Sequence, residues 1–409
     1  MNIVIWDIET DSSNTFFGSI IEIGAILLND KFQELDKLNI RCRLPEGVVP
    51  QAGALLVNQS SVSLLTQANY SHYQMLQEVE TTFKKWSPAI FLGYSNINFD
   101  DEMLRKEFFK GLRQPYLTNT NGNKRQDGLN IVRAAFAVNN KIMKTELNEK
   151  GNAVMKLESL ARMNGIESGG AHNALFDANL TKLVLEKIYK EQNITWRSAM
   201  LTGSREEVEN FARNELIFSL NEYFYGKSKL YLVTPLYHEH MLHPIYKWVQ
   251  AFDLRFDPEI YFDLSLNDLK IEMKKTPKFI RTIRSNKAPV LLHADYASKS
   301  DPYVAMTKEQ LLKRAKLIKG NKDFCARVSL ALAEIAQEKK DSGDQSDITP
   351  EESIYVKWVD NSETPKMEKW HQASWEEKFK LLDNFKDERL IDFGKKIIYQ
   401  EAPQVLPET

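Results

Sequence analysis

The chain has 409 residues, of which 43% are hydrophobic and 27% charged, and its formal net charge is −2. This length predicts two or three domains, and the composition excludes collagen-like, disordered and coiled-coil proteins. No apolar run reaches 18 residues, and residues 2–7 lack the features of a signal peptide. Two cysteines, Cys42 and Cys325, exclude a disulfide framework and a thiolate zinc site. We therefore expect a cytoplasmic protein with no membrane partner.

Strand and helix patterns alternate over the first 200 residues. Four segments have the composition of strands, at residues 3–6, 22–28, 39–43 and 89–94. Apolar residues at helical spacing predict helices at 73–86, 100–110 and 174–189, and another that opens at Asp127. Three early strands followed by helix–strand–helix units predict an α/β fold, a mixed sheet flanked by helices.

A polar stretch at residues 202–204 is a candidate domain boundary. Beyond it we expect one helix over 205–223, then strands at 229–233, 246–252 and 288–292. From residue 307 onward the pattern is helical. The sequence thus predicts three domains, which comprise residues 1–200, a small strand-rich module over 201–305, and a helical region over 306–409.

Six basic residues and no acid lie between Met273 and Ala294. A basic stripe on a nearly neutral chain is typical of a phosphate-binding channel, and also of a plain solvated face. The six are Lys274, Lys275, Lys278, Arg281, Arg284 and Lys287.

The first candidate site is Asp7-Ile8-Glu9, at the end of the first predicted strand. Residues two apart on a strand point to the same face, so the two carboxylates lie together. Carboxylate oxygens are hard ligands that suit Mg²⁺ or Mn²⁺. The alternative is a solvated strand end without function.

Two further motifs carry an acid or a histidine. Asp100 follows the strand at 89–94 where a helix should begin, so it is either an N-cap or a metal ligand. His172 precedes the helix at 174–189, and Asp177 lies five residues later, inside that helix. An imidazole with a pKa near 6.5 suits proton abstraction at neutral pH.

In this order the three motifs resemble the DEDDh family of 3′→5′ exonucleases, in which carboxylates converge on two metal ions. The match narrows to the bacterial exodeoxyribonuclease I family. It is carried by Trp6-Asp7-Ile8-Glu9-Thr10 and by residues 50–57, 92–102 and 157–172. The resemblance is specific up to about residue 190 and weaker beyond.

The resemblance implies a 3′→5′ exodeoxyribonuclease that degrades single-stranded DNA to 5′-mononucleotides, in DNA repair or recombination. It implies a ribonuclease H-like first domain, a Src-homology-3-like module and a helical region, here shorter than is usual in the family. Asp7, Glu9 and Asp177 would hold the ion that binds the attacking water. Asp7 and Asp100 would serve a second Mg²⁺, with Mn²⁺ as a substitute, and His172 would be the general base.

The resemblance and the basic stripe also suggest partners. Residues expected to contact the DNA are Thr10, Asn96, Asn98, Lys156, Lys274, Lys278, Arg281 and Arg284. The family binds the acidic tail of single-stranded-DNA-binding protein with several arginines. Asn139 and Ser298 replace two of these here and Lys319 retains a charge at a third, so we expect a weakened contact. The expected state is a monomer.

Two other interpretations remain open from the sequence. An exoribonuclease or a proofreading exonuclease of the same superfamily would use the same chemistry, although such proteins lack the additional 200 residues seen here. A non-catalytic single-strand-binding protein would use the basic stripe alone. It would have no need for all five catalytic positions.

Overall fold

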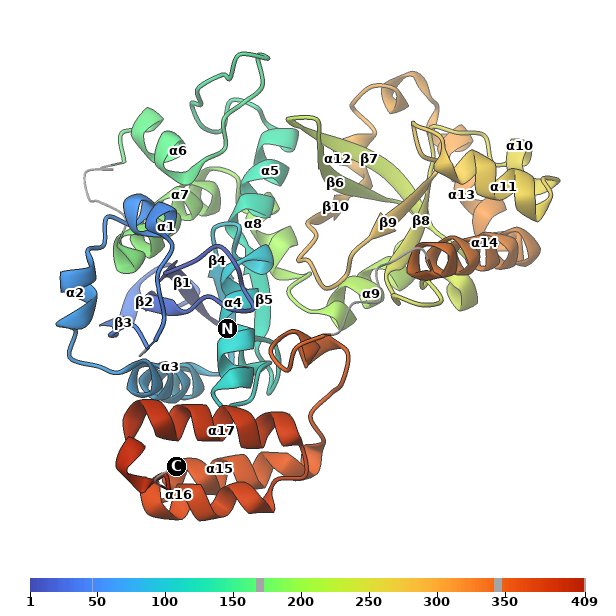
Figure 1. Ribbon diagram of the computed structural model, residues 1–409. Coiled ribbons are helices and arrows are strands. Elements are labelled where there is room, and N and C mark those ends of the chain that lie inside the picture. Colours follow the sequence, from blue (N-terminus) through green and yellow to red (C-terminus); the bar gives the residue numbers. More distant parts are fainter. Residues whose placement is uncertain (46, 167–172, 342–347, 408–409) are drawn as a thin grey trace. The chain divides into compact units, whose positions relative to one another are not determined.

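The computed structural model describes residues 1–45, 47–166, 173–341 and 348–407 (Figure 1). The chain forms two compact units. Unit 1 comprises residues 1–125, 168–182 and 346–409, and unit 2 comprises residues 126–167 and 183–345. Each unit is therefore built from separate stretches of the sequence.

A five-stranded mixed sheet forms the centre of unit 1, in the order β3-β2-β1-β4-β5. The central strand β1 pairs antiparallel with β2 and parallel with β4. All nine residues of β2 are buried, as the apolar run that predicted it requires. The strands are β1 (Asn2–Thr10), β2 (Ile20–Leu28), β3 (Glu34–Arg41), β4 (Ala89–Gly93) and β5 (Lys124–Asp127). The predicted mixed sheet is confirmed.

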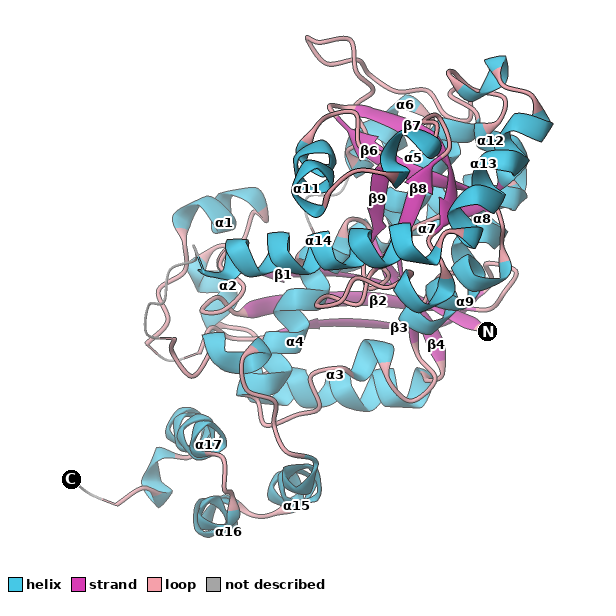
Figure 2. Cartoon of the chain, turned by 90° about the vertical axis from the view of Figure 1, so that its right-hand side faces the viewer, coloured by secondary structure: helices cyan, strands magenta, loops and turns pink. Residues whose placement is uncertain are grey.

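One face of this sheet is covered by helix α3 (His72–Trp86), which runs alongside the strands (Figure 2). Its start is fixed by a capping box between Ser71 and Gln74. Trp6 of β1 and Phe83 of α3 meet in the core beneath it, with ring centroids 5.9 Å apart. The other helices of the N-terminal part of this unit are α1 (Ala52–Val57), α2 (Val62–Thr66) and α4 (Asp100–Lys110).

The last helices of the chain also belong to unit 1 and lie beside α3 (Figures 1 and 2). They share a second apolar core with α3 and α4, in which Tyr73 and Phe109 meet Trp370 and Phe393. These helices are α15 (Thr364–Gln372), α16 (Trp375–Leu381) and α17 (Glu388–Glu401).

Unit 2 contains an antiparallel five-stranded sheet in the order β10-β6-β7-β8-β9. Its strands are β6 (Phe218–Phe224), β7 (Lys227–Pro235), β8 (Val249–Asp253), β9 (Ile280–Ile283) and β10 (Leu291–His293). Its longer helices are α5 (Gly128–Val138), α8 (Asn193–Met200), α9 (Arg205–Asn214), α11 (Leu266–Lys274), α13 (Lys308–Gly320) and α14 (Lys322–Asp341), with a short α6 (Leu157–Met163). Helix α7 (Ala174–Glu191) runs from unit 1 into unit 2.

Some expectations about unit 2 were wrong in detail. The helix expected over 205–223 ends at Asn214, because the alternating residues from Phe218 onward pair with β7 as a strand. Strand β9 was not expected, and it lies inside the basic stripe. The Src-homology-3-like character of this module stays a prediction. The division into three domains also stays a prediction. The two compact units do not follow its boundaries.

Two expectations from composition can be compared with the described residues. None of their helices combines the length and apolar character needed to cross a bilayer. Cys42 and Cys325 are both buried and both free.

Candidate active site

The site begins on the face of β1 opposite to α3. Because side chains alternate along a strand, Trp6 and Ile8 point into the core under α3, whereas Asp7 and Glu9 point to the other face. Both carboxylates are half-buried there. The prediction that the two acids share a face is consistent with this burial pattern.

Helix α7 reaches this second face at Gly24 of β2. Gly24 lies directly opposite Asp7 in the strand pairing. A Cβ atom on Gly24 would lie 2.0 Å from the backbone nitrogen of Leu175, so only glycine permits this approach. Asp177 follows within the first turn of α7. The carboxylate oxygens of Asp7, Glu9 and Asp177 consequently lie within 4.8 Å of one another.

A buried acid on β2, Glu22, ties the start of α7 to the sheet. Glu22 is opposite Glu9 in the strand pairing and is almost inaccessible to solvent. Its Oε1 accepts a hydrogen bond of 2.5 Å from Nδ2 of Asn173, and its Oε2 accepts one of 2.8 Å from Nε of Arg41. The Oδ1 atom of Asn173 in turn accepts from the backbone N–H of Phe176, at 3.2 Å. Asn173 thus joins β2 to the first turn of the helix that carries Asp177.

These supporting residues were not expected from the sequence, although two of them leave a signal there. An acid in the apolar run of residues 20–28 requires a partner when the strand is buried on both faces. A glycine within such a strand marks a close approach by another backbone. Asn173 has no comparable signal, because its partner Glu22 lies 151 positions away.

The clustering of acids disfavours their charged forms. Burial raises the pKa of Asp7 well above its usual value, and Asp100, Asp177, Glu9 and Glu22 raise it further by repulsion. Burial, followed by repulsion from Asp177 and Glu22, raises the pKa of Glu9 to about 8. Closely spaced carboxylate oxygens of this kind are the ligands that Mg²⁺ and Mn²⁺ prefer, and a bound cation would relieve the repulsion. The residues present therefore fit a divalent metal.

Asp100 belongs electrostatically to the same cluster. It is the first residue of α4, whose N-cap is Phe99, so the N-cap interpretation of Asp100 was wrong. Burial is the main cause of the raised pKa of Asp7, and repulsion from Asp100 is the second largest cause. The neighbouring Asp101 is engaged elsewhere, with an oxygen 3.2 Å from Oγ1 of Thr118 and another 3.4 Å from Nη1 of Arg125.

Four other residues that were expected to act in catalysis or to contact the substrate also lie within the first 185 residues. His172 lies outside the described residues. The Thr10 hydroxyl is buried and donates to the carbonyl of Ser12 at 2.9 Å. The Asn96 side chain is also buried, whereas Asn98 is exposed and accessible to a substrate. A substrate role for these side chains stays a prediction.

The basic residues expected to contact DNA belong to unit 2 and differ in their surroundings. Arg281 is buried in β9, where its Nε lies 2.9 Å from Oδ2 of Asp253 and its Nη1 lies 2.5 Å from Oε2 of Glu222. Its charge is therefore neutralised within the protein. The other four, Lys156, Lys274, Lys278 and Arg284, are exposed.

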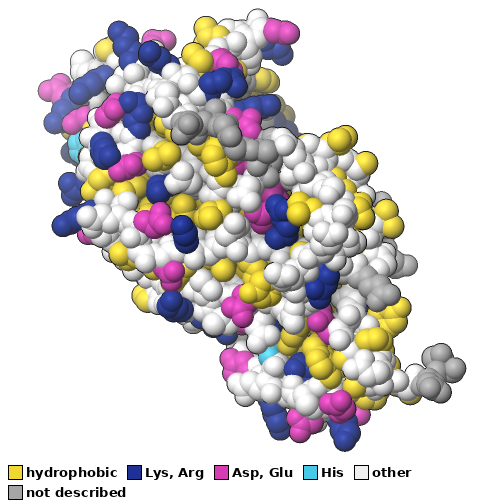
Figure 3. Space-filling view, turned by 90° about the vertical axis from the view of Figure 1, so that its left-hand side faces the viewer, with side chains coloured by type: hydrophobic (Ala, Val, Ile, Leu, Met, Phe, Trp, Pro, Cys, Tyr) yellow, Lys and Arg dark blue, Asp and Glu magenta, His cyan; other side chains and the backbone are white. Residues whose placement is uncertain are grey.

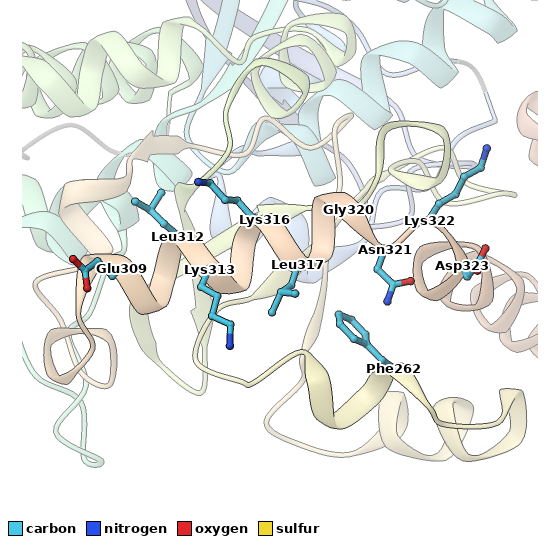
Figure 4. Close-up of a pocket in the computed structure, with 10 residues that line it drawn as sticks. All are labelled: Phe262, Glu309, Leu312, Lys313, Lys316, Leu317, Gly320, Asn321, Lys322 and Asp323. Atoms are coloured by element: carbon cyan, nitrogen blue, oxygen red, sulfur yellow. The ribbon is translucent and has the colours of Figure 1, made fainter.

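Pocket size does not identify the site, and charge does not single it out on the face drawn in Figure 3. On the face drawn in Figure 3, acidic and basic side chains are interspersed. A pocket of about 900 Å³ lies in unit 2, where Phe262 points toward α13, and Lys313 and Lys316 project from that helix (Figure 4). None of the clustered carboxylates lines this pocket. Its lining residues are Phe262, Glu309, Leu312, Lys313, Lys316, Leu317, Gly320, Asn321, Lys322 and Asp323.

The raised pKa of Glu9 predicts how metal affinity and stability depend on pH. Between the ordinary value of 4.5 and the folded value of about 8, the folded protein retains a proton that the unfolded chain has released. The free energy of unfolding of the metal-free protein should therefore fall as pH rises through this window. A metal must displace this proton, so its affinity should rise with pH, by up to about tenfold per unit for this carboxyl.

Thermal unfolding at pH 5.5 to 8.5, with Mg²⁺ or with EDTA, checks this expectation. The rise in Tm caused by Mg²⁺ should grow with pH across the series. An equal rise at every pH would contradict the assignment of Glu9 as a protonated metal ligand.

The part of the chain that carries these carboxylates resembles known proteins in sequence. Residues 4–185 match the model of the exonuclease family. The residues that match are called here the exonuclease-family domain, after the model that they match. It contains β1, β2, α4 and the part of α7 that carries Asp177, and therefore all of the clustered carboxylates.

Relatives of the exonuclease-family domain are exodeoxyribonucleases I. The protein from Buchnera aphidicola subsp. Schizaphis graminum is 27% identical over 194 residues, which are 47% of this chain and 40% of the relative. For the Escherichia coli protein the identity is 26% over 186 residues, 45% of this chain and 39% of the relative. The match thus spans less than half of each of these relatives.

Solved structures extend the similarity beyond this domain. Exonuclease I from Methylocaldum szegediense has a TM-score of 0.80 at 19% identity, covering 99% of this chain and 86% of that one. Escherichia coli exonuclease I in complex with a dA16 oligonucleotide has a TM-score of 0.80 at 18% identity, covering 100% and 88%. An ExoI/SSB-Ct complex has a TM-score of 0.78 at 18% identity, covering 100% and 87%. The expected α/β fold class and the resemblance to bacterial exodeoxyribonuclease I are confirmed.

Proposed function

We propose that this chain is a 3′→5′ exodeoxyribonuclease that degrades single-stranded DNA and releases 5′-mononucleotides. The observation that carries the proposal is the convergence of Asp7, Glu9 and Asp177 within 4.8 Å, with Asp100 close enough to raise the pKa of Asp7. A cluster of half-buried acids is costly without a cation. Its position inside an exonuclease-family domain supports phosphodiester hydrolysis as its purpose.

Two divalent ions, Mg²⁺ or alternatively Mn²⁺, fit the donor set that we assign to this site. Asp7, Glu9 and Asp177 would hold one ion, and Asp7 with Asp100 would hold the other. Bound ions of this kind stabilise the charge on the phosphoryl oxygens and generate a nucleophile from water at neutral pH.

The protein's own groups have two further tasks in this proposal. We propose that His172 is the general base that accepts the proton of the attacking water, because an imidazole titrates near neutral pH. Asn173, the next residue, donates to Glu22 immediately before the start of α7. Gly24 and Glu22 together keep α7 against the sheet, so that Asp177 faces the two acids of β1.

The choice of substrate rests on the relatives. Their names specify exodeoxyribonuclease I, and a structure of the same fold holds a dA16 oligonucleotide. We extend this to single-stranded DNA as the substrate here, and to a role in DNA repair or recombination in the cytoplasm. A monomer is the proposed state.

We also propose a contact with single-stranded-DNA-binding protein, weaker than that of the family. The support is the fold shared with the ExoI/SSB-Ct complex. Of the three residues compared above, only Lys319 of α13 retains a positive charge, and burial lowers the pKa of its ammonium. Asn139 and Ser298 have no charge to offer an acidic tail.

A time course on end-labelled strands tests the activity. With Mg²⁺, a 3′ label on single-stranded DNA should be released at once as a mononucleotide, and a 5′ label should give a ladder of shortening products. EDTA, duplex DNA and RNA should give no product. Comparable degradation of RNA would assign the chain to the exoribonucleases. DNA binding without any hydrolysis would favour a non-catalytic single-strand-binding protein.

A further inference from the structure

The hairpin formed by β6 and β7 in unit 2 ends in three consecutive aromatic residues that are exposed. Tyr223 is 37% exposed, Phe224 52% and Tyr225 85%. The rings of Phe224 and Tyr225 contact each other, with centroids 4.2 Å apart. Exposed apolar groups gathered in this way commonly mark a binding surface, whereas single ones need no explanation. These three residues are named here the aromatic tip.

The aromatic tip is held in place by its turn and by two neighbours. Tyr225 and Gly226 both have positive φ angles, 49° and 79°, as a two-residue type I′ turn requires. Asn152 packs against Gly226 so closely that a Cβ atom there would lie 2.3 Å from its Nδ2. The guanidinium carbon of Arg133 lies 4.0 Å from the ring centroid of Tyr223. A tip fixed in this way loses little conformational freedom when a ligand stacks on it.

Positive charge lies on the same face of the hairpin as the ring of Phe224. Phe224 pairs with Lys227, and Glu222 pairs with Lys229, so these four side chains share one face. The charge of Glu222 is matched by Arg281, whose Nη1 donates to its Oε2 at 2.5 Å. Both lysines are exposed, and neither forms an ion pair with any residue that the structure describes. The hairpin thus offers two exposed cations beside two aromatic rings that meet edge to face.

We propose that the aromatic tip, with Lys227 and Lys229, is a binding site for single-stranded DNA. Bases with free faces would stack on Phe224 and Tyr225, and the lysines would contact the phosphates, a combination that tolerates any sequence. A duplex hides its base faces and would not stack there. This inference rests on the proposed function, because it names a second surface by which the same substrate is held.

Binding measurements on substituted hairpins test the proposal. Phe224→Thr with Tyr225→Asn removes both rings, while the resulting Asn-Gly turn suits the left-handed backbone and preserves the hairpin. In an Asp7→Asn background that prevents degradation, we expect its affinity for a long oligothymidylate to fall about 10- to 100-fold. Lys227→Gln with Lys229→Gln should reduce the slope of log affinity against log salt by about 1.4.

Matched controls separate the hairpin from general surface effects. Tyr399→Gln removes an exposed ring from α17, and Lys395→Gln removes an exposed cation from the same helix. Both control variants should bind the oligothymidylate with the same affinity as the protein whose hairpin carries no substitution. Unchanged thermal unfolding of the hairpin variants would confirm that they fold.

Two results would overturn the inference. One is an unchanged affinity in the double aromatic variant, and the other is an equal loss for duplex DNA. A different result would show that the proposed function itself is wrong. In that case the protein without any substitution would hydrolyse no DNA strand of any length. If that protein hydrolyses both a long strand and a labelled trinucleotide, the hairpin variants should be impaired on the long strand alone.

Discussion

Replacement of Asp7 by Asn should abolish hydrolysis while DNA binding persists. Asp7 is the acid whose pKa is raised by every other member of the cluster, Asp100, Asp177, Glu9 and Glu22. An amide of the same shape removes one charge from the metal ligands and leaves the backbone of β1 unchanged. Metal ions supply several kcal/mol of transition-state stabilisation, so the turnover rate should fall by roughly 10³-fold or more.

The rate of mononucleotide release and the affinity for single-stranded DNA, measured on the same preparation, check this result. Asp30→Asn is the matched control, because it makes the same chemical change at an exposed position. The Asp7 variant should be at least as resistant to heat as the unsubstituted protein in EDTA, since it removes a repelling charge. Full hydrolysis by the Asp7 variant would exclude the proposed metal site.

Gly24→Ala should cause the second large loss, through the position of α7. The added methyl group would lie 2.0 Å from the backbone nitrogen of Leu175 and 2.3 Å from the carbonyl carbon of Ala174. Backbone atoms cannot rotate away, so the helix must move by more than 1 Å relative to the sheet, by our rough estimate from ordinary contact distances. Asp177 would move with it, and a displacement of about 1 Å can reduce a rate about 10²-fold.

The effect should be visible in two measurements. We expect kcat/KM to fall about 10²-fold and the Mg²⁺ concentration needed for half-maximal activity to rise, with a loss of stability of about 1–3 kcal/mol from overpacking. Gly53→Ala is the control, because a methyl group there meets no atom within 4 Å. Unchanged metal dependence in the Gly24 variant, with a normal thermal transition, would contradict a positioning role for this glycine.

The parts of the site that could be predicted from the sequence are those governed by local geometry. Asp7 and Glu9 share a face because side chains alternate along a strand. Local patterns placed Asp100 after a buried strand and Asp177 inside a helix, whereas the family resemblance implied that both are metal ligands. These features need only the residues within a few positions of each other.

The parts that could not be predicted depend on contacts between distant segments. Gly24 allows α7 to approach the sheet closely, and this role depends on Leu175, which is distant in the sequence. The same holds for the hydrogen bond between Glu22 and Asn173. The expected helix over 205–223 failed for a similar reason, since its second half becomes a strand by pairing with β7.

The return of α15–α17 to α3 and α4 has a consequence for synthesis of the chain on the ribosome. The side chains that cover Tyr73 and Phe109 include Trp370 and Phe393, which are made more than 250 residues later. At about 5–20 residues per second, the interval between β1 and α17 is roughly 20 to 80 seconds. During that time the apolar surface of α3 and α4 lacks its final cover. Apolar surface exposed in this way is prone to aggregation, so the nascent protein would benefit from chaperones until α15–α17 have been translated.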